Sequence, residues 1–270
     1  MNAKNGTQMN AEKTDQGRSC KPFKFDLALS VLSAFICVLL LCAVCPAQIH
    51  PHSFSPRQLG VMQAWYRADA VTGLADGAAV ASWVDSTANA RTLAQSTAAY
   101  RPAYKAGIQN GRPAIRFDGT NDVLTGAFAG SPQFTIFSVQ RPNLFTAEEP
   151  VYFAESYNIE AAYSDSSHVE FWFNSLAGWS YYQVLHSSSI AIPELWSLRY
   201  DQAWLRFWCD GVALTPQAET RTPYLASTLQ LSAVGRTFNG DMFELAFFNV
   251  ALSDRDRQRV ERYLARKWGL

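Results

Sequence analysis

The sequence has no excess of charge of either sign and few of the residues used in metal or phosphate chemistry. Its 23 basic residues balance its 23 acidic ones, and it contains four histidines. A protein that binds a phosphate backbone needs an excess of Lys and Arg, so we expect no nucleic-acid partner. Glycine-rich phosphate loops and the Gly-x-Ser-x-Gly motif of serine hydrolases are also missing.

Cysteine is scarce in most of the chain. Cys20, Cys37, Cys42 and Cys45 all lie before residue 48, and only Cys209 follows. This distribution excludes an intramolecular disulfide or a cysteine-rich zinc site after residue 47. The stability of that part must come from packing, and the 48% apolar composition is sufficient for a sizeable core.

A long apolar run occurs near the N-terminus. Residues 27–44, LALSVLSAFICVLLLCAV, follow a polar, mainly basic start and precede Cys45-Pro46-Ala47. This order predicts a signal peptide over residues 1–47. An uncleaved transmembrane helix is the alternative, because 18 apolar residues can span a bilayer, and a lipid-modified cysteine is a third. In each case we expect a secreted or cell-envelope protein that touches a membrane only through this segment, if at all.

The remaining chain divides into a linker over residues 48–58 and one domain over residues 59–270. Ser55 and Pro56 are typical of a helix start, so we expect a short helix over residues 56–66. From residue 130 onward the apolar residues alternate with polar ones. The clearest stretches are TIFSVQ (135–140), HVEFWF (168–173), AWLRFWCDG (203–211) and MFELAFFNV (242–250). Short alternating strands between turn signals predict an all-β antiparallel β-sandwich or jelly roll.

A helix is predicted at the C-terminus. Ser253 is a good N-cap, Asp256 follows three residues later as in a capping box, and Gly269 follows the last turn. Its apolar stripe consists of Val260, Leu264 and Trp268. The other sides carry Arg255, Arg257, Arg259, Arg262, Arg266 and Lys267. We interpret these cations as a solvated face, the alternative being recognition of an acidic partner.

Four stretches resemble bacterial laminin-G-like domains of the concanavalin-A-like lectin/glucanase superfamily. They are AWYRADAVTGLADGAAVASWVDSTANARTLAQSTAAYRPAY (64–104), NGRPAIRFDGTNDVL (110–124), WSLRYDQAWLRFWCDG (196–211) and GDMFELAFFNVALSDRDRQRVERYLARKWGL (240–270). The resemblance covers about residues 59–270. It implies a concanavalin-A-like jelly roll whose last helix lies against the sandwich edge or joins the N-terminal segment, and it says little about the ligand.

Some members of this superfamily cleave glycans, which requires two carboxylates about 5 Å apart in a retaining enzyme. The alternating Glu-x-Asp-x-x-Glu strand of the family glucanases is missing here. Glu148 and Glu149 are adjacent, Glu155 and Glu160 flank a predicted turn, and Glu170 has no acidic neighbour two residues away. We therefore expect no enzyme, unless two strands assemble a carboxylate pair.

The turn DGTND offers three oxygen-bearing side chains within five residues. Asp118, Asn121 and Asp122 could together hold calcium, which related domains bind in loops at the sheet rim. Asp241 is a further candidate from the second half of the chain. The alternative is a hydrogen-bonded turn, in which the same oxygens accept from backbone N–H groups.

Six aromatics lie in HVEFWFNSLAGWSYYQ, residues 168–183. Alternation directs Val169, Phe171 and Phe173 to the core of a hairpin and leaves several rings on its other face. Sugar-binding proteins stack a pyranose on such rings and bond its hydroxyls with amides and carboxylates. The candidate ligand-binding residues are Glu170, Trp172, Trp179, Tyr181 and Gln183. Alternatively, the rings only stabilise cross-strand pairs.

The sequence thus favours an exported, non-catalytic recognition module whose partner is extracellular or cell-wall carbohydrate. A structural or adhesion module that binds extracellular protein is the first alternative. A divergent glycan-cleaving enzyme is the second.

Overall fold

The computed structural model describes residues 54–145, 149–154, 159–175, 177–223, 225–233 and 237–270. The predicted signal peptide or anchor, residues 1–47, lies outside these residues. Within them, no helix is both long and apolar enough to cross a membrane.

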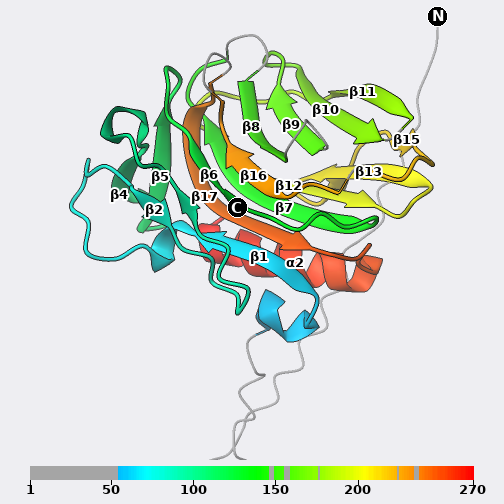
Figure 1. The fold of residues 1–270 in the computed structure, drawn as a ribbon, viewed down its shortest axis with the longest axis horizontal. Helices are drawn as coiled ribbons and strands as arrows, with labels where there is room; N and C mark the ends of the chain where they lie inside the picture. Colours follow the sequence, from blue (N-terminus) through cyan, green and yellow to red (C-terminus); the bar gives the residue numbers. More distant parts are fainter. Residues whose placement is uncertain (1–53, 146–148, 155–158, 176, 224, 234–236) are drawn as a thin grey trace, which may run out of the picture. The chain divides into compact units, whose positions relative to one another are not determined.

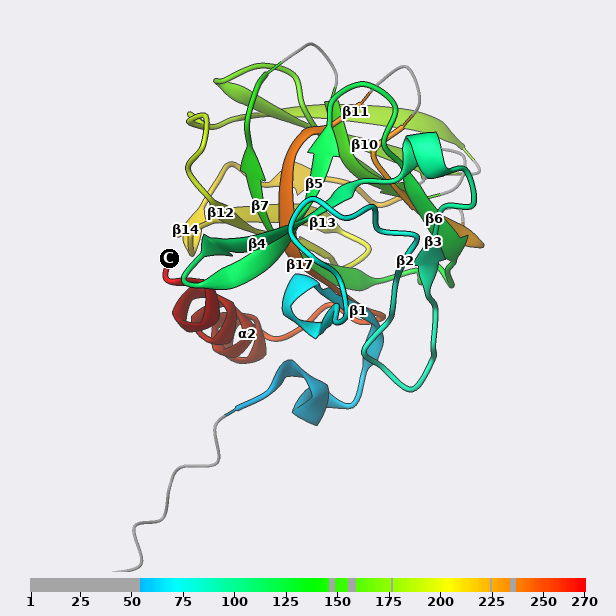
Figure 2. The same cartoon turned by 90° about the vertical axis from the view of Figure 1, so that its left-hand side faces the viewer.

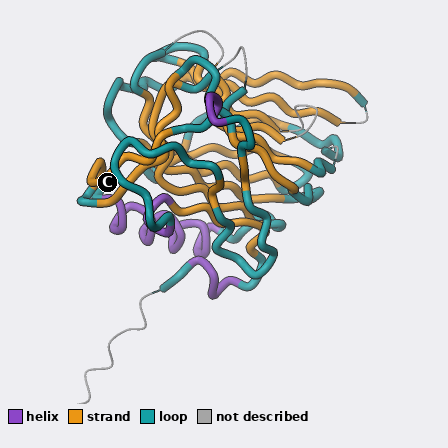
Figure 3. The backbone as a smooth tube through the Cα atoms, turned by 60° about the vertical axis from the view of Figure 1, so that its left-hand side comes forward, coloured by secondary structure: helices purple, strands orange, loops and turns teal. Residues whose placement is uncertain are grey.

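Strands dominate the described part of the chain (Figure 3). They are β1 (Met62–Arg67), β2 (Ser82–Trp83), β3 (Leu93–Ala94), β4 (Ala103–Gln109), β5 (Arg112–Asp118), β6 (Leu124–Ala127), β7 (Phe134–Pro142), β8 (Glu149–Ala154), β9 (Ile159–Tyr163), β10 (His168–Ser175), β11 (Gly178–Leu185), β12 (Glu194–Tyr200), β13 (Trp204–Cys209), β14 (Val212–Ala213), β15 (Gln217–Ala218), β16 (Thr228–Leu231) and β17 (Asn239–Phe248). The helical elements are the 3-10 helices η1 (Pro56–Leu59), η2 (Ala68–Ala70) and η3 (Ala98–Tyr100), and the α-helix α2 (Asp254–Trp268).

The strands form two sheets, which stack as a sandwich (Figure 1). Sheet A has the order β14-β13-β12-β7-β17-β5-β4, with β1 paired to β17 and β15 paired to β13. Sheet B has the order β11-β10-β9-β8-β16-β6-β3-β2. The paired strands in both sheets are antiparallel, which confirms the predicted antiparallel β-sandwich.

The core between the sheets follows the predicted alternation. Val169, Phe171 and Phe173 on β10 are buried, as is Phe207 on β13. The rings of Phe171 and Phe207 have centroids 4.3 Å apart and join the two sheets. Aromatic residues on facing strands therefore fill this layer, as period-two patterning requires.

Helix α2 covers a second apolar layer on the outer face of sheet A (Figure 2). Its stripe of Val260, Leu264 and Trp268 is buried, as predicted. The predicted helix ends are also confirmed, because Ser253 Oγ accepts a hydrogen bond from Asp256 N and Gly269 adopts a left-handed conformation. Because both faces of sheet A are covered here, β7 and β17 are buried along almost their full length.

The cations of α2 do not all form a solvated face, which corrects the sequence-based interpretation. Arg257 is 4% exposed, and its guanidinium lies 4.0 Å from the ring centroid of Trp208 and pairs with Glu261. The side chain of Lys267 is 8% exposed. Both side chains tie the helix to sheet A instead of facing water.

The predicted helix over residues 56–66 is wrong beyond its first turn. Residues Pro56–Leu59 form η1, and Gly60 then ends it with a φ of 72°. The following residues form β1, which pairs with β17 from Met62↔Phe248 to Arg67↔Glu244. The start and the end of the described chain are thereby joined within one sheet.

Candidate functional site

The predicted ligand-binding residues lie on the β10–β11 hairpin at the edge of sheet B. The register pairs Trp172 with Tyr181 and Glu170 with Gln183. Antiparallel partners project to the same side of a sheet, so these four side chains share the face opposite the core. We call these four residues the hairpin face.

Two rings form the centre of the hairpin face. The rings of Trp172 and Tyr181 have centroids 4.8 Å apart, tilted by 51°. Tyr181 is 44% exposed, whereas Trp172 is half-buried. Tyr181 Oη donates a hydrogen bond to Glu170 Oε1 at 2.5 Å, so the ring is held at both ends. An exposed phenol ring in a fixed orientation is suited to stack on a sugar.

The polar members of the hairpin face differ in exposure. Gln183 is exposed. Glu170 is only 6% exposed, so it holds Tyr181 in place rather than facing solvent as a ligand group. The backbone of Trp179 pairs with Asn174, but its side chain lies outside the described residues.

The fold assembles a carboxylate pair that no single strand revealed. The β9–β10 register sets Glu160 opposite Trp172 and Ala162 opposite Glu170, so the two glutamates are diagonal neighbours on one face. The Cα atoms of diagonal neighbours lie about 7 Å apart, so the two glutamate side chains are adjacent on this face. Glu160 is fully buried and Glu170 nearly so, which leaves neither carboxylate open to a substrate.

The residues predicted to bind calcium form a hydrogen-bonded turn. Asp118 Oδ1 accepts from Thr120 N at 2.8 Å and Asn121 N at 3.3 Å, and Asp122 Oδ2 accepts from Asp118 N at 2.9 Å. These bonds engage one carboxylate oxygen of each aspartate within the turn, and the calcium site stays a prediction.

Asp241, the additional calcium candidate, is not available to that turn. It is fully buried on β17, and its carboxylate pairs with Arg116 at 2.7 Å and with Arg141. Both of its oxygens are therefore occupied by guanidinium groups.

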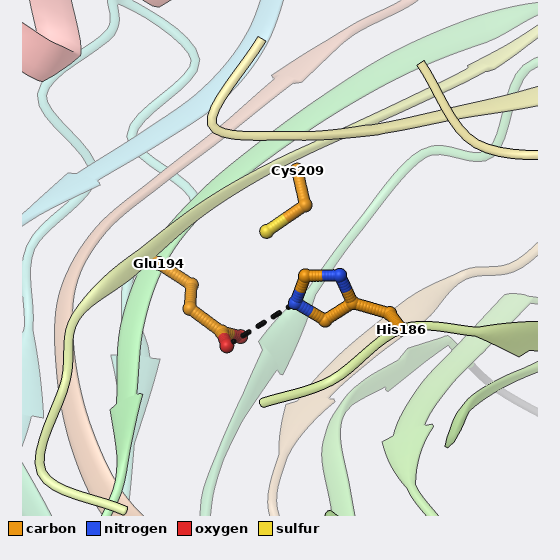
Figure 4. A group of neighbouring side chains, drawn as sticks. All are labelled: His186, Glu194 and Cys209. Carbon is orange, nitrogen blue, oxygen red and sulfur yellow. Dashed lines mark hydrogen bonds and ion pairs between the residues drawn. The ribbon is translucent and has the colours of Figure 1, made fainter. Parts of the chain in front are cut away.

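A polar cluster that the sequence did not predict lies between the sheets. His186, Glu194 and Cys209 point toward one another from the end of β11, from β12 and from β13 (Figure 4). His186 Nε2 lies 3.3 Å from Glu194 Oε1. Tyr163 Oη and Trp196 Nε1 donate to Glu194 Oε2 at 2.9 and 2.8 Å. Sequence reasoning missed the cluster because its three members belong to different strands or strand ends, and only the fold brings them together.

Imidazole, carboxylate and thiol groups are ligands that zinc prefers, and a structural zinc site holds four of them. Among the described residues the cluster offers three such groups, with ligand atoms within 4.8 Å of one another. Burial, with Glu194 and Asp210 nearby, raises the pKa of the Cys209 thiol well above its usual range and favours the neutral thiol. The hydrogen bonds already satisfy Glu194, so we assign the cluster to the core.

Comparisons with known proteins identify the fold. No family model and no curated protein match the sequence. Among solved structures, domain 4 of AbnA, an extracellular arabinanase from Geobacillus stearothermophilus in complex with arabinotriose, is 16% identical with a TM-score of 0.54. That comparison covers 74% of this chain and 97% of that domain.

Two further solved structures are similar. The ligand-binding domain of botulinum neurotoxin serotype D, in complex with N-acetylneuraminic acid, is 8% identical with a TM-score of 0.60 over 77% of this chain. Trypanosoma rangeli sialidase is 11% identical with a TM-score of 0.53 over 77% of this chain. This chain spans about half of the toxin domain (53%) and a third of the sialidase (33%). At these identities the likeness shows a β-sandwich fold and does not single out laminin-G-like domains.

Proposed function

We propose that this protein is an exported, non-catalytic recognition module that binds carbohydrate at the hairpin face. The observation that carries the proposal is the exposed ring of Tyr181, held against Trp172 beside the exposed amide of Gln183. One ring face and one amide provide the two interactions that a sugar needs, stacking and hydrogen bonding.

The solved structures support carbohydrate as the partner class. The arabinanase domain was solved with arabinotriose and the toxin domain with N-acetylneuraminic acid. Their fold is shared with this chain, although their sites and sugars belong to those proteins. Export rests on the predicted signal peptide or anchor over residues 1–47. The finer laminin-G-like assignment rests on the sequence resemblance.

The binding mechanism follows from the fixed geometry of Tyr181. Because its hydroxyl bonds Glu170 at 2.5 Å and its ring contacts Trp172, little side-chain entropy is lost when a sugar stacks on it. Glu170 acts as a positioning residue, and Gln183 is placed to bond a hydroxyl of the stacked ring.

The test is glycan binding by the purified full-length protein and a Tyr181→Ala variant. The panel contains arabinan, sialylated oligosaccharides and insoluble cell-wall polysaccharides, each with and without calcium. We expect saturable binding to a panel member and at least about a fivefold loss of affinity in the variant, since an aromatic contact contributes about 1 kcal/mol. Trp204→Ala is the matched control, because Trp204 is similarly exposed (40%) but lies on sheet A.

Other results would favour the alternatives. Equal affinity in Tyr181→Ala would remove the hairpin face as the site. Failure of every glycan would favour the adhesion module, for which Leu185, Ile190 and Ile192 offer exposed apolar side chains within eight residues. Glycan cleavage abolished by Glu170→Gln would establish the enzyme, and it would require the buried Glu160–Glu170 pair to open to the substrate.

A further inference from the structure

A second recessed surface lies away from the hairpin face, between the first elements of the described chain and helix α2. It is a cleft of about 780 Å³, lined by residues of η1, β1, η2, β5 and α2. Seven of its twelve lining residues are Arg or Lys, and Asp69 supplies its one carboxylate. A volume of this size is typical of ligand sites.

Two cations of this basic cleft, Lys267 and Arg112, are neutralised by nearby carboxylates. Lys267 Nζ lies 2.8 Å from Asp69 Oδ1 and 2.6 Å from Glu244 Oε2. Arg112 Nη1 lies 3.3 Å from Asp69 Oδ2. These contacts bind the end of α2 to η2 and β17, and they leave little charge for a ligand.

The charge of Arg259, a third cation of the cleft, is also neutralised. Arg259 lies 3.0 Å from Asp256 Oδ1, and its guanidinium lies 4.2 Å from the ring centroid of Phe54. The half-buried rings of Phe54 and Tyr263 give this side of the cleft an apolar surface beside the cations.

Four arginines of the cleft have no carboxylate partner among the described residues. Arg57 donates a hydrogen bond to the carbonyl oxygen of Ser86, and Arg67 Nε donates one to Ser86 Oγ at 3.1 Å. Arg262 and Arg266 are exposed on α2, one turn apart. Two elements distant in sequence therefore bring unneutralised guanidinium groups to one recess.

This concentration of positive charge is local. Residues 48–270 contain 18 basic and 20 acidic residues, obtained by subtracting the five basic and three acidic residues of positions 1–47 from 23 of each. The cleft nevertheless gathers seven of those 18 cations. A general attraction to polyanions would need a net positive surface, whereas a cationic recess selects anions that fit inside it.

We propose that the basic cleft binds an acidic polysaccharide, with its sulfate or carboxylate groups on Arg57, Arg67, Arg262 and Arg266. Guanidinium groups bind such oxyanions in a bidentate manner, and Arg262 and Arg266, one helical turn apart, offer two of them side by side to a polymer with several charges. The ring of Tyr263 offers a face for the apolar side of a sugar. This site is separate from the hairpin face and goes beyond the proposed binding of carbohydrate there.

The half-buried side chains of Arg67 and Tyr263 favour a saccharide that enters the cleft over the flat surface of a lipid bilayer. Nucleic acid is disfavoured by the net negative charge of residues 48–270. A lipid surface is therefore kept as an outcome of the test and not as a second proposal.

The experiment measures binding of the purified full-length protein to heparin, polygalacturonate and neutral arabinan at 50 and 200 mM NaCl. The variant is Arg262→Gln/Arg266→Gln, whose side chains make no ion pair with another described residue and can be replaced without disturbing the core. The matched control is Arg255→Gln, an exposed arginine of the same helix outside the cleft. A suspension of phosphatidylglycerol vesicles is the lipid probe.

We expect one of the two acidic polysaccharides to bind, with affinity that falls as salt rises. The double variant should lose at least about tenfold in affinity and the control less than about twofold. Equal affinity in the double variant, failure of both acidic polysaccharides, or binding to the vesicles alone would overturn the proposal.

The same samples distinguish this site from the hairpin face. Tyr181→Ala should retain acidic-polysaccharide binding if the cleft is the site. Loss of neutral-glycan binding in Tyr181→Ala, together with no acidic-polysaccharide binding in any sample, would uphold the proposed function and overturn only the cleft.

Discussion

Asp122 is a residue whose burial has a measurable consequence for stability. Burial raises its pKa to about 6, opposed by the hydrogen bond from Asp118 N and supported by the nearby Asp118 charge. An aspartate in an unfolded chain has a pKa of about 3.9. The folded protein therefore holds this proton more tightly, and the resulting stability is present below about pH 4 and lost as the pH rises through about 6.

We predict that Asp122→Asn weakens the decline in stability between pH 4 and pH 7 and stabilises the protein at pH 7. Asparagine keeps an oxygen that can accept from Asp118 N but carries no charge. Urea denaturation across this pH range measures the slope. Asp76→Asn is the control, since hydrogen bonds from Ala106 N and Lys105 lower the pKa of Asp76 and its slope has the opposite sign. An unchanged slope in Asp122→Asn would contradict the assignment.

At the residue scale, alternation predicted which face a side chain occupies but not how deeply it is buried. Trp172, Tyr181 and Glu170 share a face as expected, yet Glu170 is 6% exposed while Tyr181 is 44% exposed. Tyr181 contributes to this difference, because its hydroxyl donates a hydrogen bond to Glu170 and lies over it. A period-two pattern carries no information on such a cross-strand contact.

At the scale of single elements, helix α2 offers a direct test of its N-cap. Ser253 Oγ accepts from Asp256 N at 3.1 Å and donates to Asp256 Oδ2 at 3.0 Å. We predict that Ser253→Ala lowers the free energy of unfolding by about 1 kcal/mol. Chemical denaturation measures it, with Gln258→Ala, an exposed position of the same helix, as a control expected to lose nothing. A neutral Ser253→Ala would mean that the helix end is held by packing alone.

Elements were predictable where local signals and packing agree. The closing helix was predicted because Ser253, Gly269 and the apolar stripe all mark the same span. Residues 56–66 failed because only the start was signalled, and Gly60 at a φ of 72° ends the turn. Pairing with β17 then makes residues 62–67 a strand, a contact with residues 177 to 186 positions later that no local pattern encodes.

At the scale of the whole molecule, a buried ion pair joins the end of the chain to the sandwich. Lys267 Nζ lies 2.6 Å from Glu244 Oε2. Burial raises the pKa of Glu244 above its usual value, although Lys267 and hydrogen bonds from Trp268 and Trp65 oppose this shift. Removing one partner of a buried pair leaves an uncompensated charge and typically costs 3 to 5 kcal/mol, roughly.

We predict that Lys267→Met destabilises the protein by about 3 kcal/mol at pH 8 and by less at pH 5. Without Lys267 the pKa of Glu244 should rise further. As the pH falls, Glu244 then takes up a proton, and the loss of stability caused by the substitution becomes smaller. Thermal and urea denaturation at both pH values provide the measurement. Lys105→Met, which breaks the more exposed pair with Asp76, should cost less than about 1 kcal/mol at either pH. Similar losses for the two variants would refute the role of the buried pair.

The sandwich as a whole was predictable, whereas its recesses were not. Alternating strands, turn residues and the resemblance together predicted the class of fold. The basic cleft depends on Arg57 and Arg67 meeting Arg262 and Arg266, and this meeting follows from the pairing of β1 with β17. From the sequence, the arginines of α2 could be recognised as an alternative binding face for an acidic partner. The sequence did not reveal that Arg57 and Arg67 lie across from them and complete a cleft.

The position of the basic cleft relative to the hairpin face determines how many glycans one molecule can bind. Both views show the β10–β11 hairpin at one end of the sandwich and η1 with α2 at the other (Figures 1 and 2). Two sites so placed cannot share one sugar unit, so a single copy would be bivalent. It could cross-link a neutral chain to an acidic one, and in a mixed matrix the second contact would form at a high effective concentration.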